Sequence, residues 1–164
     1  MTNDQASTPQ PAAAMEQRTG LFTGSFDPFT IGHDDIVRRA LPLFDRLVIG
    51  VVEANANKHH SLSADERRQQ IARLYRDEPK VEVRVYSSLA VELAKSIGAR
   101  YIIKGVRSVK DFEYEREQAE VNRQISGVET LLLPADPRLA AISSSMVREL
   151  AHFGYDVTPF LPKQ

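Results

Sequence analysis

A histidine follows a glycine at the end of the segment GSFDPFTIGH, residues 24–33. Gly24 permits a sharp turn and the close approach of a ligand, and Ser25 offers a hydroxyl group beside it. Apolar residues with helical spacing follow His33, which places His33 in a first helical turn, where free N–H groups and the helix dipole favour an anion. His33 could instead only cap or pack, but the surrounding glycines and hydroxyls favour a phosphate-binding role. The Gly-Lys-Ser/Thr run of a P-loop is absent.

Two further segments carry groups that could hold the same anion. KGVRSVKDFEYE, residues 104–115, places Lys104 and Arg107 on either side of a glycine, and two cations can bind a charged phosphate. AISSSMVREL, residues 141–150, places three serines where a helix begins, whereas a helix N-cap needs only one. The surplus hydroxyls and the free N–H groups of that turn could form a neutral anion cradle.

A fourth segment, NANKHHSL at residues 55–62, carries Lys58. A lysine on a polar loop could move onto a bound phosphate and shield its charge in the transition state. The adjacent His59 and His60 lack further ligands at metal-binding spacing, so the sequence predicts no protein metal site. There is also no Gly-x-Ser-x-Gly elbow, and phosphoryl or nucleotidyl transfer suits the groups present, because it depends on positioning and electrostatic stabilisation.

The elements that must position these groups alternate between strand and helix five times. Apolar runs predict strands at 21–24, 46–52, 81–86, 100–105 and 129–134. A capping box at Ser63 and Glu66 begins one intervening helix, and Gly98, Gly127 and Gly154 are placed to end others. Such alternation predicts a single α/β domain with a doubly wound, five-stranded parallel sheet and right-handed crossovers. Ligands of such sheets bind beyond the carboxyl ends of the strands, where all four candidate segments fall.

Composition restricts the class of protein. The 164 residues fit one domain, with 42% apolar and 26% charged side chains. The net charge of −1 gives no general attraction to nucleic acid or membrane, and the lack of cysteine excludes disulfides and thiolate chemistry. Residues 1–18 are expected to be a disordered leader without a secretory signal, which leaves residues 19–164 as the folded domain and the cytoplasm as the simplest location.

Four motifs resemble those of bacterial phosphopantetheine adenylyltransferases. SFDPFTIGH at 25–33 resembles the family's T-F-D-P-x-T-x-G-H, and the segment at 104–115 resembles R-G-[LI]-R-x-x-x-D-F-E-Y-E. ISSS at 142–145 resembles I-S-S-[ST], and GYDVTPFLP at 154–162 resembles the closing G-x-D-V-x-x-x-[LV]-P. T-x-G-H alone marks only the wider nucleotidyltransferase superfamily, but the four motifs occur in the family's order and extend from residue 20 to 162.

The resemblance implies a Rossmann-like fold and a reaction. The phosphate of 4′-phosphopantetheine would attack the α-phosphate of ATP, giving dephospho-coenzyme A and pyrophosphate, without a covalent intermediate. The family uses Mg2+ with ATP and is usually a homohexamer, and feedback binding of coenzyme A is a further option that the sequence leaves open.

The resemblance also implies site residues by motif position. The catalytic roles fall to His33, Lys58 and Ser25, with His33 and Lys58 on the reacting phosphates. Phosphopantetheine would contact Ser25, Lys58, Ala90 and Lys104. A larger set, drawn from three of the motifs, would bind ATP: Ser25, Phe26, His33, Gly105, Val106, Arg107, Glu115, Leu139, Ala140, Ala141, Ile142, Ser143, Ser144 and Ser145.

Several positions depart from the family pattern. Ser25 stands where threonine is usual and keeps the hydroxyl group. Lys104 stands where arginine is usual and keeps the charge but not the bidentate fork. The loop around Lys58 lacks the usual K-x-P-x-F pattern, and Leu139 replaces a tryptophan found in some members. The contacts of the loop are therefore left open, but no group that the chemistry needs is lost.

Two alternatives to this function stay open. The acceptor could be another phosphorylated molecule, such as nicotinate mononucleotide, although the D-F-E-Y-E helix and the short chain favour phosphopantetheine. The chain could instead be a non-catalytic nucleotide sensor, although a binder would not need both His33 and Lys58. The helix predicted over 110–126 has apolar residues Tyr114, Val121 and Ile125 on one face, which suits either a neighbouring subunit or burial within its own.

Overall fold

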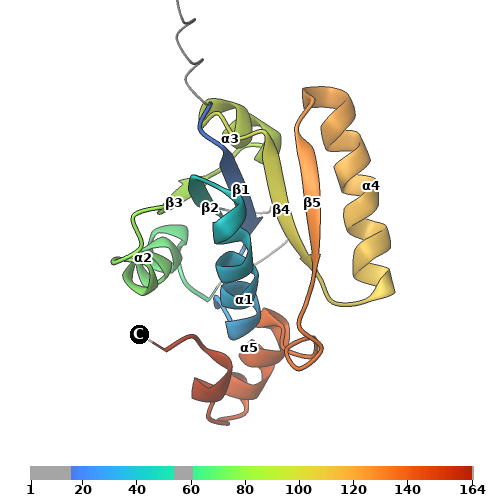
Figure 1. Cartoon of the computed structure of the whole chain (residues 1–164). Helices are drawn as coiled ribbons and strands as arrows, with labels where there is room; N and C mark the ends of the chain where they lie inside the picture. The colour runs from blue at the N-terminus through green and yellow to red at the C-terminus, as the bar shows by residue number, and fades with distance from the viewer. Residues whose placement is uncertain (1–15, 54–60, 164) are drawn as a thin grey trace, which may run out of the picture.

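The computed structural model of the chain describes residues 16–53 and 61–163. Leader residues 1–15 and the segment 54–60, which carries Lys58, lie outside the described residues. Within the described ranges, strands and helices alternate as predicted (Figure 1). Their bounds are β1 (Thr19–Gly24), α1 (Ile31–Ala40), β2 (Arg46–Val52), α2 (Ala64–Leu74), β3 (Val81–Tyr86), α3 (Ala90–Ser96), β4 (Tyr101–Val106), α4 (Val109–Ser126), β5 (Glu129–Pro134) and α5 (Ser144–His152).

The strands of the described chain form one parallel sheet in the order β3-β2-β1-β4-β5. β1 lies in the centre, pairing with β2 along its whole length and with β4 over residues 20–22. The chain winds outward from β1 to β3 and then crosses back to β4, so the strand order reverses between β1 and β4. This is the predicted Rossmann-like sheet, and its reversal point is where such sheets bind ligands.

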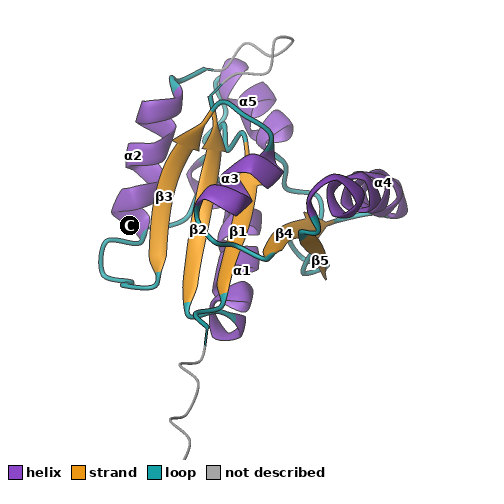
Figure 2. Cartoon of the chain, turned by 90° about the horizontal axis from the view of Figure 1, so that it is seen from above, coloured by secondary structure: helices purple, strands orange, loops and turns teal. Residues whose placement is uncertain are grey.

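The core lies on both faces of this sheet, because successive side chains of a strand point to opposite sides. Phe22 and Ile103 belong to one core cluster, to which α1 and α2 contribute their buried apolar side chains. Leu21 and Ile102, each one residue earlier, belong to a second cluster with the buried side chains of α3. Figure 2 shows α1 and α3 on opposite sides of the sheet. Continuous apolar runs in β1 and β4 are therefore explained by burial on two faces.

Helix ends follow signals that are local in the sequence. The Ser63 hydroxyl accepts a hydrogen bond from the Glu66 N–H (3.2 Å), and the Glu66 carboxylate accepts one from the Ser63 N–H (2.8 Å). This is the predicted capping box, and α2 begins at the next residue, Ala64. Gly127 ends α4 with a left-handed φ of 73°, also as predicted. Leu89 is the N-cap residue of α3 and is 60% exposed.

The last two helices are less covered than the first three. None of the described side chains of α4 is buried, and this helix lies beside β4 and β5 (Figure 1). α5 lies at the end of the sheet toward which the strands point and buries one residue, Val147. Across residues 16–53 and 61–163, no helix is both long and apolar enough to cross a membrane.

Candidate active site

A pocket of about 510 Å³ opens where the strand order reverses, between the carboxyl ends of β1 and β4. Its size falls within the range of roughly 300–1,000 Å³ that is usual for small-molecule sites. Three of the predicted segments contribute to its lining, namely 24–33, 104–115 and 141–150. The described residues of the fourth segment, Ser61 and Leu62, do not line it. The fold therefore brings together groups that are far apart in the sequence.

His33 is held by the N-terminus of α1. The backbone N–H of Thr30, the N-cap residue, donates a hydrogen bond to His33 Nδ1 over 2.9 Å. The imidazole thus occupies the place that Glu or Gln takes in an ordinary capping box. Because Nδ1 accepts this bond, the proton of a neutral imidazole must reside on Nε2. His33 caps the helix through Nδ1 and keeps the Nε2–H as a donor for a ligand. Capping and phosphate binding, the two roles that the sequence suggests, are therefore compatible.

Aromatic rings surround His33 on several sides. The ring centroids of Phe26 and Phe29 lie 5.1 and 5.3 Å from that of His33, and Phe22 lies at 6.3 Å. Burial, and to a lesser extent the positive charge of Arg107, lowers the pKa of His33 from 6.5 to about 4. His33 is therefore neutral at pH 7 and offers a single N–H donor to the pocket that it lines.

The loop between β1 and α1 has an unusual backbone. Phe26 has φ of 51°, a left-handed conformation that a bulky side chain rarely adopts. Its ring packs against Gly24, where an added Cβ would lie 2.8 Å from the ring carbon Cε1. Asp27 is buried and accepts a hydrogen bond from the Ser61 N–H over 2.8 Å. Strained backbone of this kind concentrates at functional sites, where the surrounding structure holds it in place.

Two predicted cations reach the pocket with carboxylate partners. Lys104 Nζ lies 3.7 Å from the carboxylate of Glu115, which the family motif assigns to ATP. Arg107 Nε lies 3.2 Å from Asp111, which also accepts the Arg107 backbone N–H. These ion pairs bring the charges to the pocket wall without removing them from solvent, so an entering phosphate could compete for either cation.

A third cation in the pocket, Arg148, was not predicted from the sequence. Its guanidinium donates to the Asp27 carbonyl (2.5 Å) and to the Ser145 hydroxyl (3.3 Å). Arg148 follows Ser145 by three residues at the start of α5, so both lie on one side of the helix. In the sequence, a cation three residues after the serine turn is the feature that could have indicated Arg148 as a pocket residue.

The three serines have different partners. Ser143 is the N-cap of α5 and accepts the Met146 N–H over 3.1 Å. The Ser144 hydroxyl donates to the Pro28 carbonyl over 2.8 Å and so joins this turn to the β1–α1 loop. Ser145 is held by Arg148, and all three serines line the pocket. The turn is therefore part of the pocket wall as well as a helix start.

The pocket includes most of the predicted site residues, but not all. Val106, Ala140 and Ala141 lie next to lining residues and do not themselves line it. Ala90 begins α3 and packs against the second core cluster, away from the pocket lining. Lys58 lies outside the described residues. The other predicted residues are brought together: Ser25, Phe26, His33, Lys104, Gly105, Arg107, Glu115, Leu139, Ile142, Ser143, Ser144 and Ser145.

Comparisons with known proteins agree with this geometry. The chain matches the Cytidylyltransferase-like family over residues 21–150. A phosphopantetheine adenylyltransferase of Porphyromonas gingivalis is 50% identical over 149 residues, covering 91% of this chain and 97% of that protein. A protein of the same name from Phocaeicola vulgatus is 47% identical, covering 89% of this chain and 96% of its own. A third, from Rhizorhabdus wittichii, is 45% identical, covering 90% and 89%.

Solved structures of lower identity share the fold. A protein from Vibrio parahaemolyticus, described as a nicotinate-nucleotide adenylyltransferase, aligns with a TM-score of 0.63 at 16% identity. The alignment covers 90% of this chain and 94% of that chain. At 16% identity this likeness shows only a shared fold. The relatives at 45–50% identity show the family. The chain belongs to the Cytidylyltransferase-like family and, within it, to the phosphopantetheine adenylyltransferases.

Proposed function

We propose that the chain transfers the adenylyl group of ATP to 4′-phosphopantetheine, giving dephospho-coenzyme A and pyrophosphate. The observation that carries this proposal is the neutral His33 at the start of α1, whose Nε2–H is left for a ligand in a pocket also lined by Lys104, Arg107 and Arg148. The names of the relatives support the choice of acceptor. Such a set of donors and cations suits a polyanionic substrate better than a neutral one.

The chemistry follows from where charge develops. An oxygen of the acceptor phosphate forms a bond to the α-phosphorus of ATP, and the bond from that phosphorus to the bridging oxygen of pyrophosphate breaks. Negative charge spreads over the non-bridging oxygens during this exchange. His33 can donate its N–H to one of these oxygens, and the cations offset the charge on the leaving pyrophosphate. No proton has to move and no protein nucleophile is required.

We assign ATP to the wall built from the serine turn and residues 105–115, and the acceptor phosphate to the side of Ser25 and Lys104. Arg148 joins the ATP side, because it holds Ser145. Lys58 stays a predicted catalytic residue on the basis of the sequence alone. Magnesium would enter with the ATP phosphates and neutralise part of their charge. Residues 16–53 and 61–163 hold no cluster of three or more His, Asp or Glu side chains suited to a metal, so the nucleotide would supply its ligands.

We further propose a homohexamer that works in the cytoplasm and binds coenzyme A as a feedback ligand. The outer face of α4 supports an assembly, because Tyr114, Val121 and Ile125 are 62, 51 and 55% exposed. Coenzyme A contains the phosphopantetheine portion of the acceptor, so it would compete at the same pocket. Light scattering of the purified chain and of Val121→Glu tests the assembly: a hexameric mass for the first and a smaller one for the second are expected.

One experiment tests the proposed activity. The protein is incubated with Mg-ATP and 4′-phosphopantetheine, and pyrophosphate release is followed. Release that depends on both substrates supports the proposal. Release with nicotinate mononucleotide in place of phosphopantetheine would replace the acceptor, and ATP binding without any release would indicate the sensor.

A further inference from the structure

Arg67 is a cation on the inward face of α2. The buried residues of this helix are Ala64, Arg67 and Ile71, which have the spacing of a stripe that faces a core. An arginine at such a position is rarely fully buried, yet Arg67 is only 1% exposed. Burial of this kind needs partners for the guanidinium, and the partners show what the residue holds.

The guanidinium of Arg67 binds backbone carbonyls. Nε donates to the Leu62 carbonyl (3.2 Å), Nη1 and Nη2 donate to that of Val52 (3.1 Å each), and Nη2 also donates to that of Glu53 (3.4 Å). Nη1 further donates to the Ser25 carbonyl. These five hydrogen bonds match the five N–H groups of an arginine. One side chain thus joins the carboxyl ends of β1 and β2 to the start of α2.

The bond to Ser25 has a geometric consequence for the pocket. In a trans peptide the C=O and the following N–H point in opposite directions, so a Ser25 carbonyl turned to Arg67 turns the Phe26 N–H away from it. Ser25 and Phe26 line the pocket and Arg67 does not, so the guanidinium holds the Ser25 carbonyl from outside the pocket lining. Among the described residues, no hydrogen bond uses the Phe26 N–H, so it is available to a ligand.

We propose that Arg67 is a positioning residue, which orients the Ser25–Phe26 peptide so that the Phe26 N–H faces the phosphates of the bound nucleotide. This proposal rests on the proposed function only for the identity of the nucleotide. The left-handed φ of Phe26 is part of the same arrangement, because the carbonyl before it is held by Arg67. Arg67 touches no substrate and acts through the backbone of the β1–α1 loop.

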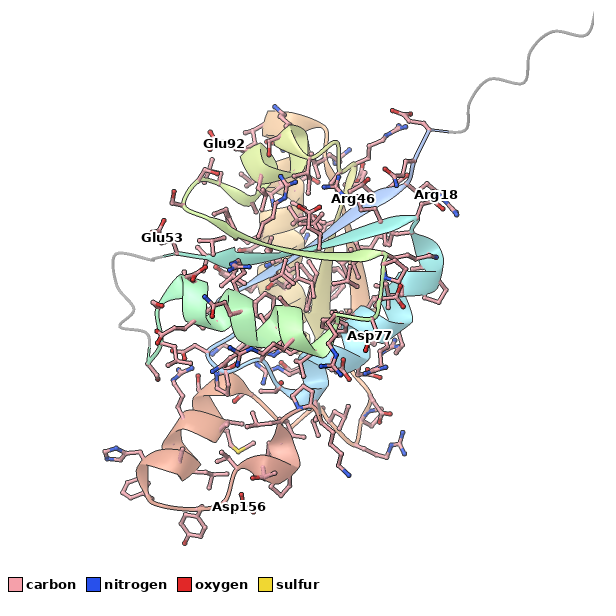
Figure 3. The ribbon with its side chains drawn as sticks, turned by 90° about the vertical axis from the view of Figure 1, so that its left-hand side faces the viewer. Arg18, Arg46, Glu53, Asp77, Glu92 and Asp156 are labelled. Carbon is pink, nitrogen blue, oxygen red and sulfur yellow. The ribbon has the colours of Figure 1, made fainter. Side chains whose placement is uncertain are left out.

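The test compares two arginine-to-lysine variants. Arg67→Lys keeps the charge but cannot direct a planar fork at four carbonyls, and we expect kcat to fall about 100-fold with a smaller change in the KM for ATP. Arg46→Lys is the matched control, because Arg46 also donates to a backbone carbonyl, that of Ile97, and lies at the end of β2 opposite Glu53 (Figure 3). Its kcat should stay near that of the wild type. Wild-type kcat in folded Arg67→Lys, or an equal loss in Arg46→Lys, overturns the proposal.

A measurement on the wild-type protein covers the case in which Arg67→Lys does not fold. The amide proton of Phe26 should move downfield when ATP is added, and the side-chain N–H protons of Arg67 should exchange slowly before and after. An unmoved Phe26 amide in protein shown to bind ATP, or fast-exchanging Arg67 protons, overturns the proposal. Because this readout needs ATP alone, a wild type that binds ATP but does not turn over phosphopantetheine defeats the proposed activity and not this inference.

Discussion

The two halves of the sheet supply different parts of the site. The first half, residues 19–86, buries nearly all of β1 and β2 and contributes inward-facing residues from both α1 and α2. The second half, residues 100–163, has an α4 without a buried side chain and an α5 with one. His33 belongs to the first half, and the cations Lys104, Arg107 and Arg148 belong to the second.

The first half of the sheet therefore supplies a hydrogen-bond donor that is fixed in place, and the second half supplies cations whose carboxylate partners a phosphate can replace. The His33 ring is packed among phenylalanines and bonded at Nδ1, so its remaining N–H has one direction and one protonation state at neutral pH. Lys104 and Arg107 are paired with carboxylates at the pocket wall, and a phosphate can replace such partners. A preorganised donor acts on the transition state, whereas adaptable cations mainly attract and hold the substrate.

The largest loss of kcat is expected when His33 is replaced, and this variant tests the contrast between a fixed donor and exchangeable cations. His33→Ala should lower kcat about 1,000-fold, because it removes the preorganised donor, and should leave the Kd of ATP nearly unchanged. Steady-state pyrophosphate release and calorimetric ATP binding measure the two quantities. If kcat and ATP affinity fall by the same factor, His33 only binds ATP and the contrast between the halves is wrong.

A second effect compares one glycine from each half. Gly24→Ala should destabilise the fold by about 2 kcal/mol and also lower activity, because the new methyl group would displace the Phe26 ring. Gly127→Ala should cost about 1 kcal/mol through its left-handed φ alone and leave kcat unchanged, since nothing lies within 4 Å of its added Cβ. Denaturant unfolding and pyrophosphate release distinguish them. If the two variants lose the same fraction of kcat, the β1–α1 loop is no more tightly coupled to the chemistry than the turn after α4.

The third effect concerns the exchangeable charges. Lys104→Ala should raise the KM for phosphopantetheine about tenfold, with a smaller change in kcat, because a charge–phosphate contact of this kind is worth about 1.4 kcal/mol. Lys104→Arg should lower the same KM, since the bidentate fork fits a phosphate better. A rise in the KM for ATP alone would place Lys104 on the nucleotide side instead.

Near neutral pH, the smallest effect is the change of stability with pH. The pKa of His33 is lowered to about 4, so between pH 6.5 and 4 the unfolded chain binds a proton that the folded chain does not. The contribution of His33 to stability is therefore constant above pH 6.5 and falls below it, by up to about 1.4 kcal/mol per pH unit. The difference in unfolding free energy between the wild type and His33→Gln isolates this term. A difference that does not change with pH would contradict the lowered pKa of His33 and its neutral imidazole.

Much of the fold and part of the site could be predicted from the sequence. The capping box at Ser63 and the glycine after α4 depend on residues a few positions apart, and their predictions are confirmed. The sequence did not indicate that Arg67 holds the β1–α1 loop or that Arg148 lines the pocket. Both read as ordinary helical surface charges until the helices are placed, because their partners lie 42 and 121 residues away in the chain.

The sequence by itself determined the alternation of strands and helices, the motifs and therefore the family, because these depend on local periodicity and on residue identity. Only the tertiary structure decided the strand order, the convergence of three segments on one pocket and the neutral state of His33. These depend on which distant segments meet, and the cost of burying a charge among aromatic rings arises only once the rings are brought together. The orientation of the Ser25–Phe26 peptide also depends on the tertiary structure, because Arg67, which holds the Ser25 carbonyl, comes from α2.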